Sequence, residues 1–158
     1  MPVYNEENLL PHSLSRLRLN QHIELIVVDG GSTDRTVEVA RRFTERVIQA
    51  PKGRAVQMNH GARVANSEIL LFLHADCILP DGAFDLIKKT LQQSEVVLGA
   101  FDIRFNRRGP CYRLIESTAN LRSRLTSVAY GDQGIFILKE QFFALGGFKE
   151  MPLMEDIE

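Results

Sequence analysis

Two apolar runs of the sequence each lead into an aspartate. Residues 70–73, all Leu or Phe, end three positions before Asp76, and residues 25–28 are followed directly by Asp29. A short apolar run bounded by polar residues is typical of a strand buried on both faces. Open α/β sheets bind their ligands beyond the carboxyl ends of such strands. We therefore expect two neighbouring strands to deliver Asp29 and Asp76 to one rim, and the chemistry to take place there.

Asp76 has the chemistry to hold a divalent cation. A hard ion such as Mg²⁺ or Mn²⁺ takes one or two carboxylates together with phosphate oxygens, and it neutralises a diphosphate leaving group. A strand would put His74 on the same side as Asp76, where it would add a nitrogen ligand or contact the diphosphate. A buried histidine with satisfied hydrogen bonds is an equally good interpretation of His74.

A basic turn precedes one of the predicted helices. Lys52, Arg54 and Gln57 surround Gly53 at its start. Backbone amides at a helix start favour phosphate, and the two cations add to this attraction. The alternative is a solvated basic turn without a ligand.

Other acidic positions have a structural alternative. Asp29 alone would be interpreted as forming the turn at Gly30. Because we expect the polar segment 2–7 at the end of the adjacent strand, a functional role for Asp29 is favoured instead. Glu155 and Asp156 could cap a helix N-terminus or supply a general base near a reacting hydroxyl, and their spacing alone favours the cap.

Composition narrows the class of protein. A chain of 158 residues suits one domain, and 44% apolar with 25% charged residues is ordinary for a globular protein. The net charge of −1 argues against nucleic acid as the main partner. Two cysteines without metal-type spacing, and no secretory signal, favour a reducing cytoplasm. Both ends look cut, so we expect residues 1–158 to be most of a single catalytic domain, incomplete at both termini.

Apolar periodicity and turn signals predict an alternation of strands and helices. We expect helices over 7–19, 34–43 (capped by Ser32 or Thr33), 54–65, 80–93, 111–125 and 140–145. We expect strands over 25–28, 47–49, 69–73, 96–105 and 134–138. The alternation predicts an α/β fold, mostly a parallel sheet with helices on both faces, and a mixed second half. The Gly-x-Gly-x-x-Gly turn of dinucleotide enzymes and the Lys-Ser/Thr ending of a phosphate-binding loop are both absent.

The motifs occur in an order that resembles the inverting family-two glycosyltransferases of the GT-A fold. The resemblance covers nearly the whole chain. In sequence order the motifs are residues 2–7 (Pro-Val-Tyr-Asn-Glu-Glu), 28–34, 52–55, 73–76 (Leu-His-Ala-Asp), 146–148 and 154–156. The Leu-His-Ala-Asp form, with residues 53–59 before it and 131–134 after it, is similar to a small bacterial branch of that family.

This resemblance implies a role for each motif. A nucleotide-diphosphate sugar, UDP-linked, would be the donor and an unidentified hydroxyl compound the acceptor, with Mn²⁺ or Mg²⁺ as cofactor. The location implied is cytoplasmic, with peripheral association at the inner face of the membrane. The implied donor-binding residues are Pro2, Tyr4, Glu6, Asp29, Asp34, Lys52, Arg54 and His74; the implied metal ligand is Asp76, the catalytic base is Asp156, and the acceptor side comprises Gly131, Asp132, Gln133 and Glu155.

One departure from the family pattern leaves alternatives open. The family's Asp-x-Asp element has His74 in its first position here. A non-catalytic nucleotide-binding module is therefore a second hypothesis. A nucleotidyltransferase ranks last, because Glu6 and Glu7 stand where that class prefers a Gly-rich basic loop.

Overall fold

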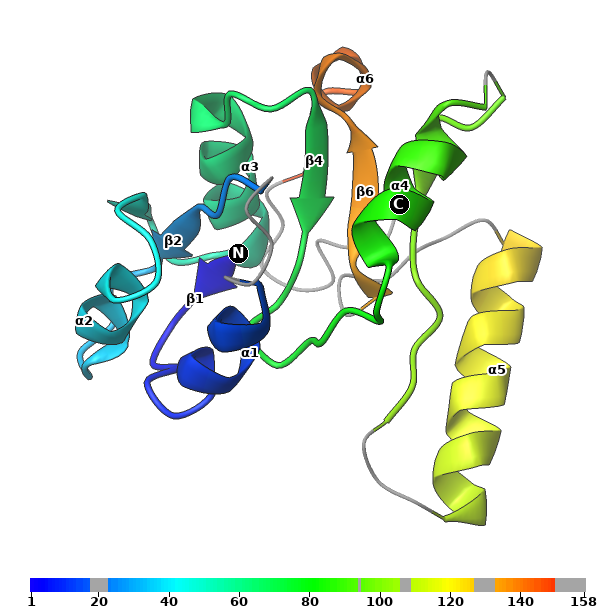
Figure 1. Ribbon diagram of the computed structural model, residues 1–158, viewed down its shortest axis with the longest axis horizontal. Helices are drawn as coiled ribbons and strands as arrows, with labels where there is room; N and C mark the ends of the chain where they lie inside the picture. Colours follow the sequence, from blue (N-terminus) through cyan, green and yellow to red (C-terminus); the bar gives the residue numbers. More distant parts are fainter. Residues whose placement is uncertain (18–22, 94, 106–108, 127–132, 150–158) are drawn as a thin grey trace.

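The computed structural model describes residues 1–17, 23–93, 95–105, 109–126 and 133–149. Strands and helices alternate along this chain, and the strands form two three-stranded sheets rather than one (Figure 1).

The first sheet is parallel and has the order β1-β2-β3. Its strands are β1 (Pro2–Val3), β2 (Val27–Asp29) and β3 (Val47–Gln49), connected through helices α1 (Leu10–Leu17) and α2 (Thr36–Arg41). Asp29 is the last residue of β2 and pairs with Val3 on one side and Gln49 on the other. The carboxyl ends of these strands therefore lie level with one another.

The second sheet is antiparallel and has the order β4-β6-β5. It contains β4 (Ile69–Phe72), β5 (Leu98–Gly99) and β6 (Ile135–Leu138), and the chain between and after these strands forms α4 (Ala83–Leu91), α5 (Pro110–Thr126) and α6 (Lys139–Ala144). The expected parallel character is thus confined to the first half. The expectation that the strands ending in Asp29 and Asp76 are neighbours was wrong, because β2 and β4 belong to different sheets.

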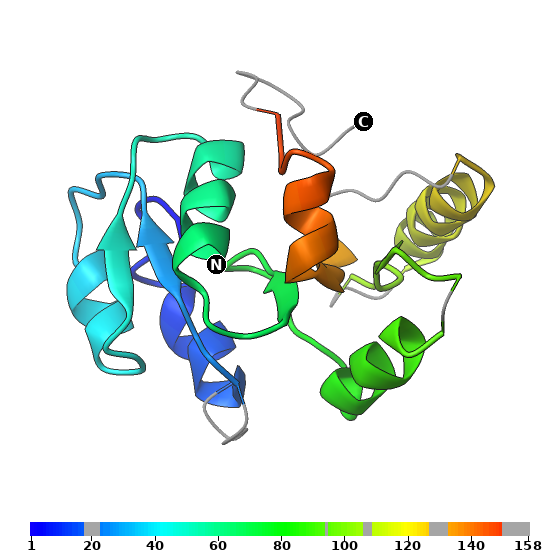
Figure 2. The ribbon, with the colours of Figure 1, turned by 90° about the horizontal axis from the view of Figure 1, so that it is seen from above.

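Helix α3 (Arg54–Val64) packs between the two sheets (Figure 2). Met58 and Ala62 of this helix belong to one buried cluster with Val28 of the first sheet and Leu70 and Phe72 of the second. Burial of the larger of these side chains, Met58, Val28, Leu70 and Phe72, contributes about 1.5–3 kcal/mol each. The packing of α3 therefore stabilises the arrangement of the two sheets.

Helix α3 also fixes the chain that follows α6. The Asn59 side chain donates a hydrogen bond to the carbonyl of Phe148 at 2.8 Å and accepts one from its N–H at 3.0 Å. The Phe148 ring meets those of Phe72 and Phe142, with centroids 4.8 and 5.3 Å away. Gly147 passes so close that a Cβ atom there would lie 2.9 Å from Asn59 Oδ1.

Two local expectations in the first half need correction. Helix α1 begins at Leu10, not at Glu7; residues 7–9 form turns instead, in which the N–H groups of Leu9 and Leu10 both donate to the Glu6 carbonyl. Neither Ser32 nor Thr33 caps α2, which begins after Arg35 without a side-chain cap.

The long strand expected over 96–105 was wrong beyond Gly99. The alternate N–H groups of Phe101, Ile103 and Phe105 do not join a neighbouring strand. They donate to the Gln133 carbonyl, Asn120 Oδ1 and Glu116 Oε1, at 2.8, 2.8 and 2.7 Å. Side chains of α5 thus satisfy part of this backbone in place of a strand.

Among the described residues, no helix combines the length and the apolar character needed to cross a bilayer. Cys77 and Cys111 form no disulfide with each other.

Candidate donor-binding site

A pocket of about 830 Å³ opens where β1 and β4 end and α3 begins. These three places are far apart in the sequence, and the fold brings them to one rim. The pocket collects most of the residues that the sequence predicts for the donor, together with the predicted metal ligand: Pro2, Tyr4, Glu6, Lys52, Arg54 and His74, and Asp76.

One wall of the pocket is aromatic and basic. The Lys52 ammonium lies over the ring of Tyr4, 3.7 Å from its centroid, a distance at which a cation is attracted to an aromatic face. Helix α3 begins at Arg54 after Gly53, and no side chain among the described residues caps it. Cationic side chains and the amides of a helix start are suited to a phosphorylated ligand.

Two acidic side chains, Glu6 and Asp76, also line the pocket and form its acidic wall. Burial raises the pKa of Glu6, and the negative charges of Asp76 and Asp34 raise it further, while Arg54 acts in the other direction. Glu6 and Asp76 are therefore close enough to repel each other. A cation between the acidic wall and a bound anion would relieve that repulsion.

The acidic wall fits a hard divalent cation. Asp76 is exposed at the pocket, with its carboxylate accessible. Within the described part of the chain, no three His, Cys, Asp or Glu side chains converge into a complete protein cage. Mg²⁺ and similar ions use one or two carboxylates, with phosphate oxygens and water completing the shell.

His74 and Asp76 lie in a turn, not on β4. The strand ends at Phe72, and the N–H of Cys77 donates to the His74 carbonyl at 3.2 Å. The expectation that strand alternation puts the two side chains on one side was therefore wrong, although both line the pocket. His74 is buried there, whereas Asp76 is exposed.

Gln57 joins the start of α3 to the ends of β1 and β2. Its side-chain nitrogen donates to the carbonyls of Val3 and Val28, at 2.9 and 2.7 Å, and its oxygen accepts from the N–H of Gly53 at 3.3 Å. Gly30 passes against this side chain, where a Cβ would come within 3.0–3.2 Å. The sequence pattern singles out Gln57 as a neighbour of Gly53. It does not indicate that the side chain joins α3 to two strands, because those partners lie far away in the sequence.

Asp29 is fully buried, with 0% of its surface exposed, and does not line the pocket. Its carboxylate accepts hydrogen bonds from the N–H groups of Gly31 and Ser32 and from the Ser32 hydroxyl. It therefore shapes the loop after β2, as the turn-forming alternative expected. Direct contact between Asp29 and a nucleotide base stays a prediction.

The loops after β1 and β2 support each other. Asn5, which has a positive φ of 55°, accepts the N–H of Thr33 at 2.8 Å and donates its own N–H to Ser32 Oγ at 2.9 Å. Asp34 accepts from Thr36 and Glu7; burial opposes its ionisation, but these hydrogen bonds prevail and lower the pKa of Asp34. Asp34 thus supports the loop and lies outside the pocket lining.

The predicted acceptor side is described only in part. Gln133 is buried away from the donor pocket, where its side chain accepts a hydrogen bond from Ser123 at 3.1 Å. Gly131, Asp132, Glu155 and the predicted base Asp156 lie outside the described residues.

Residues 1–147 match the family described as Glycosyl transferase family 2. The chain belongs to this family. A curated relative, undecaprenyl-phosphate 4-deoxy-4-formamido-L-arabinose transferase from Photorhabdus laumondii, is 28% identical over 152 residues. That match covers 87% of this chain but only 46% of the relative, so the chain spans less than half of the relative's length.

Two solved structures share the GT-A fold of this family-two chain. The mannosyltransferase PcManGT from Pyrobaculum calidifontis, in complex with GDP-Man and Mn²⁺, matches with a TM-score of 0.72 and 21% identity, over 98% of this chain and 48% of that one. TarS 1-349 from S. aureus, in complex with UDP, matches with a TM-score of 0.74 and 17% identity, over 98% and 51%. At these identities the likeness establishes the fold.

Proposed function

We propose that this chain is a glycosyltransferase that moves a sugar from a nucleotide-diphosphate donor, UDP-linked, to a hydroxyl acceptor with inversion. The observation that carries the proposal is the convergence of an aromatic and basic wall and an acidic wall on one pocket. Membership of glycosyl transferase family 2 supports it. In this proposal residues 1–158 act as one catalytic domain.

The donor would bind across both walls. Tyr4 offers an aromatic face to the base, while Lys52 and Arg54 attract the diphosphate. Asp76, with Glu6 beside it, would hold Mn²⁺ or Mg²⁺, which would neutralise the negative charge that develops on the departing diphosphate. The Mn²⁺ in the PcManGT complex supports the choice of ion.

The acceptor would be activated by Asp156. A carboxylate can take the proton of the attacking hydroxyl as that oxygen bonds to the anomeric carbon and the diphosphate leaves from the opposite face. Gly131 to Gln133 and Glu155 would line the acceptor side. Asp156 lies outside the described residues, so the motif order is what supports its role.

We also propose a cytoplasmic protein that associates peripherally with the inner face of a membrane. The name of the Photorhabdus laumondii relative includes undecaprenyl phosphate, a lipid. That name supports a lipid environment for the acceptor of this chain.

Calorimetric titration of UDP, with Mn²⁺ and then with EDTA, tests the donor site. We expect binding with the metal and at least about tenfold weaker binding without it, because the cation offsets the repulsion between Asp76 and the diphosphate. Asp76→Asn should abolish the metal dependence, whereas Asp81→Asn, a change at an exposed position outside the pocket, should leave it intact. Metal-dependent binding that persists in Asp76→Asn would exclude the metal assignment.

A nucleotide-binding module without catalysis is the second candidate. It is favoured by His74, which stands where the family pattern has a carboxylate and is buried in the pocket. The two candidates differ in turnover. Release of UDP from a UDP-sugar that slows at least about a hundredfold in Asp156→Asn supports the enzyme, while UDP binding with no turnover supports the module.

A further inference from the structure

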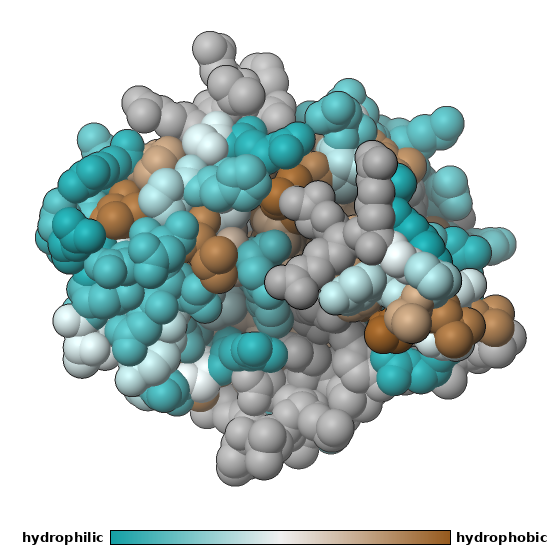
Figure 3. All heavy atoms as spheres, turned by 90° about the horizontal axis from the view of Figure 1, so that it is seen from below, coloured by the Kyte–Doolittle hydropathy of each residue, from teal (hydrophilic) through white to brown (hydrophobic). Residues whose placement is uncertain are grey.

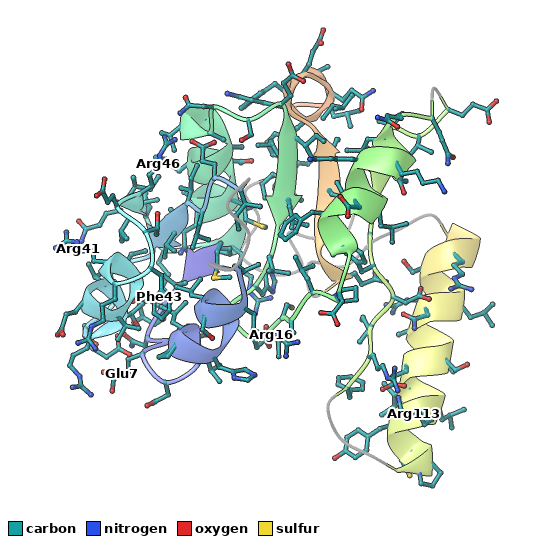
Figure 4. All side chains as sticks on the ribbon, viewed as in Figure 1. Glu7, Arg16, Arg41, Phe43, Arg46 and Arg113 are labelled. Carbon is teal, nitrogen blue, oxygen red and sulfur yellow. The ribbon has the colours of Figure 1, made fainter. Side chains whose placement is uncertain are left out.

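Lys52 is a cation of the donor pocket that forms no ion pair with any of the described residues. Its ammonium lies over the ring of Tyr4 instead, 3.7 Å from the centroid. Arg113, labelled in Figure 4, is the opposite case, because its charge is paired with that of Glu116 at 2.6 Å. The charge of Lys52 is therefore held on an aromatic face and stays available to an anion.

The backbone on both sides of this contact is held by one side chain. Gln57 donates to the carbonyl of Val3, the residue before Tyr4, at 2.9 Å, and accepts from the N–H of Gly53, the residue after Lys52, at 3.3 Å. The lysine side chain itself is exposed, and its ammonium sits at the end of a flexible four-carbon stem. The ammonium can therefore leave the ring without any movement of the backbone.

A bound diphosphate would compete with the ring for this ammonium. The start of α3, which follows Lys52 and Gly53, is where backbone amides favour a phosphate. The attraction of a cation to a partly exposed ring is weak, whereas a hydrogen bond between an ammonium and a phosphate oxygen is charge-assisted and strong. The diphosphate should therefore draw the ammonium away from Tyr4.

The side of the molecule toward which the pocket opens is suited to the approach of a charged ligand. The chain leaves β4 and enters α3 on the lower side of Figure 1. Seen from below, the half of the molecule that contains α1 and α2 is mostly hydrophilic (Figure 3).

We propose that Lys52 makes the donor pocket selective for nucleotides that carry a diphosphate, by moving between two positions. In the free chain its ammonium covers the face of Tyr4 on which the base would stack, and a bound diphosphate removes the ammonium from that face. A nucleoside without phosphate has to displace the cation unaided, so it binds more weakly than it would to an uncovered ring. This inference rests on the proposed donor site and adds a residue that distinguishes ligands sharing one base.

Equilibrium dialysis of radiolabelled UDP and uridine, both with Mg²⁺, tests the selectivity. Lys52→Ala should bind UDP at least about tenfold more weakly, because the diphosphate loses a cation. The same variant should bind uridine about two- to fivefold more tightly, because stacking on Tyr4 no longer displaces the ammonium. A purely electrostatic or structural role of Lys52 would leave uridine binding unchanged or weaken it, so the two signs separate the explanations.

Three further variants serve as controls. Lys89→Ala removes an equal charge at an exposed position of α4 outside the pocket, and it should change neither affinity. Lys52→Arg keeps the charge and should retain most of the UDP affinity. In a chain that carries Tyr4→Leu, Lys52→Ala should no longer tighten uridine binding, because the ring that the ammonium covered is gone. Circular dichroism shows whether each variant is folded.

NMR of the full chain with labelled lysine follows the side chain itself, without a base. The ε-methylene protons of Lys52, assigned through Lys52→Arg, should resonate upfield of those of the other lysines because of the ring current of Tyr4. Inorganic pyrophosphate with Mg²⁺ should move this signal to the ordinary lysine position, and Tyr4→Leu should do the same.

Two results would overturn the inference: uridine binding to Lys52→Ala that is unchanged or weaker, and a Lys52 signal that pyrophosphate does not move. If UDP binds to the parent chain and either result is found, the inference is wrong and the proposed function stands. A parent chain that binds neither UDP nor pyrophosphate would refute the proposed function and the inference together.

Discussion

The Gln57 side chain bonds three backbone segments, at Val3 of β1, Val28 of β2 and Gly53 before α3. Replacing it by leucine removes the hydrogen bonds to the Val3 and Val28 carbonyls in a buried setting. We expect Gln57→Leu to lower the free energy of unfolding by about 1–3 kcal/mol and to weaken UDP binding as well.

Urea unfolding followed by circular dichroism measures the first effect. Gln92→Leu serves as the control, because Gln92 is exposed after α4. Equal stability of the two variants would mean that the amide of Gln57 does not hold the strands.

Glu6 and Asp76 form an electrostatic pair that titration can detect. Burial and the charge of Asp76 both raise the pKa of Glu6. Asp76→Asn removes one of these causes, so the pKa of Glu6 should fall toward its ordinary value while burial keeps it from falling fully. A divalent cation at Asp76 acts in the same direction, so its binding should release protons at acid pH, where Glu6 is partly protonated.

Carbon-detected NMR titration of the Glu6 carboxyl checks this prediction. Asp81→Asn removes an equal charge at an exposed position, and it should leave the Glu6 titration unchanged. A Glu6 pKa that is the same in Asp76→Asn as in the parent chain would show that the two carboxylates do not interact.

Residue types and their positions predicted which side chains line the pocket better than they predicted the contacts that each side chain makes. Tyr4, Lys52 and Asp76 were expected at one site because their motifs follow strand ends or begin a helix, and the fold brings them together. Asp29 satisfied the same rule, yet its oxygens are occupied by Gly31 and Ser32. Position along a strand does not reveal which hydrogen bonds a buried carboxylate makes.

Among the elements, helices were predicted more accurately than sheet partners. Helix α3 lies within one residue of its expected range, because its spacing and its flanking turn are local features. The expected strand over 96–105 failed for a non-local reason. Apolar and polar side chains do alternate there, as in a strand. The N–H groups of Ile103 and Phe105, however, donate to Asn120 and Glu116, which lie 17 and 11 residues further along the chain.

Alanine substitutions at the two glycines after α6 test how the chain that follows this helix packs against α3. Gly146 and Gly147 both have a positive φ, of 90° and 75°, so an alanine at either position is strained by about 1–2 kcal/mol. Only at Gly147 would the new Cβ also meet Asn59 Oδ1, at 2.9 Å, since nothing lies within 4 Å at Gly146.

We therefore expect Gly147→Ala to destabilise the protein more than Gly146→Ala, by about 1 kcal/mol or more. The two variants differ in what the new Cβ meets, which at Gly147 is Asn59 Oδ1 at 2.9 Å and the Phe142 ring at 3.5 Å, and thermal unfolding of both measures the difference. An equal loss of stability in the two variants would show that the Asn59 side chain moves aside without an energetic cost.

For the whole molecule, the order of the motifs predicted the GT-A fold more reliably than any single pattern did. The comparisons bear out this fold over 98% of the chain. The division into two sheets was not predicted, because hydrophobic periodicity identifies strands but says nothing about which strands pair.

The donor pocket is lined by residues at the end of β1, in the first sheet, and by the turn after β4, in the second, while α3 packs between the two sheets. A ligand that contacts both segments thus acts as a crosslink between two halves of the molecule. UDP with Mn²⁺ should slow amide hydrogen exchange in β2 and β4 together, including amides that touch no ligand. Suppressing motion between the halves costs free energy that the donor's contacts must supply. A core substitution such as Met58→Ala, remote from the sugar, should therefore weaken binding, because a looser molecule loses more motion when the donor binds.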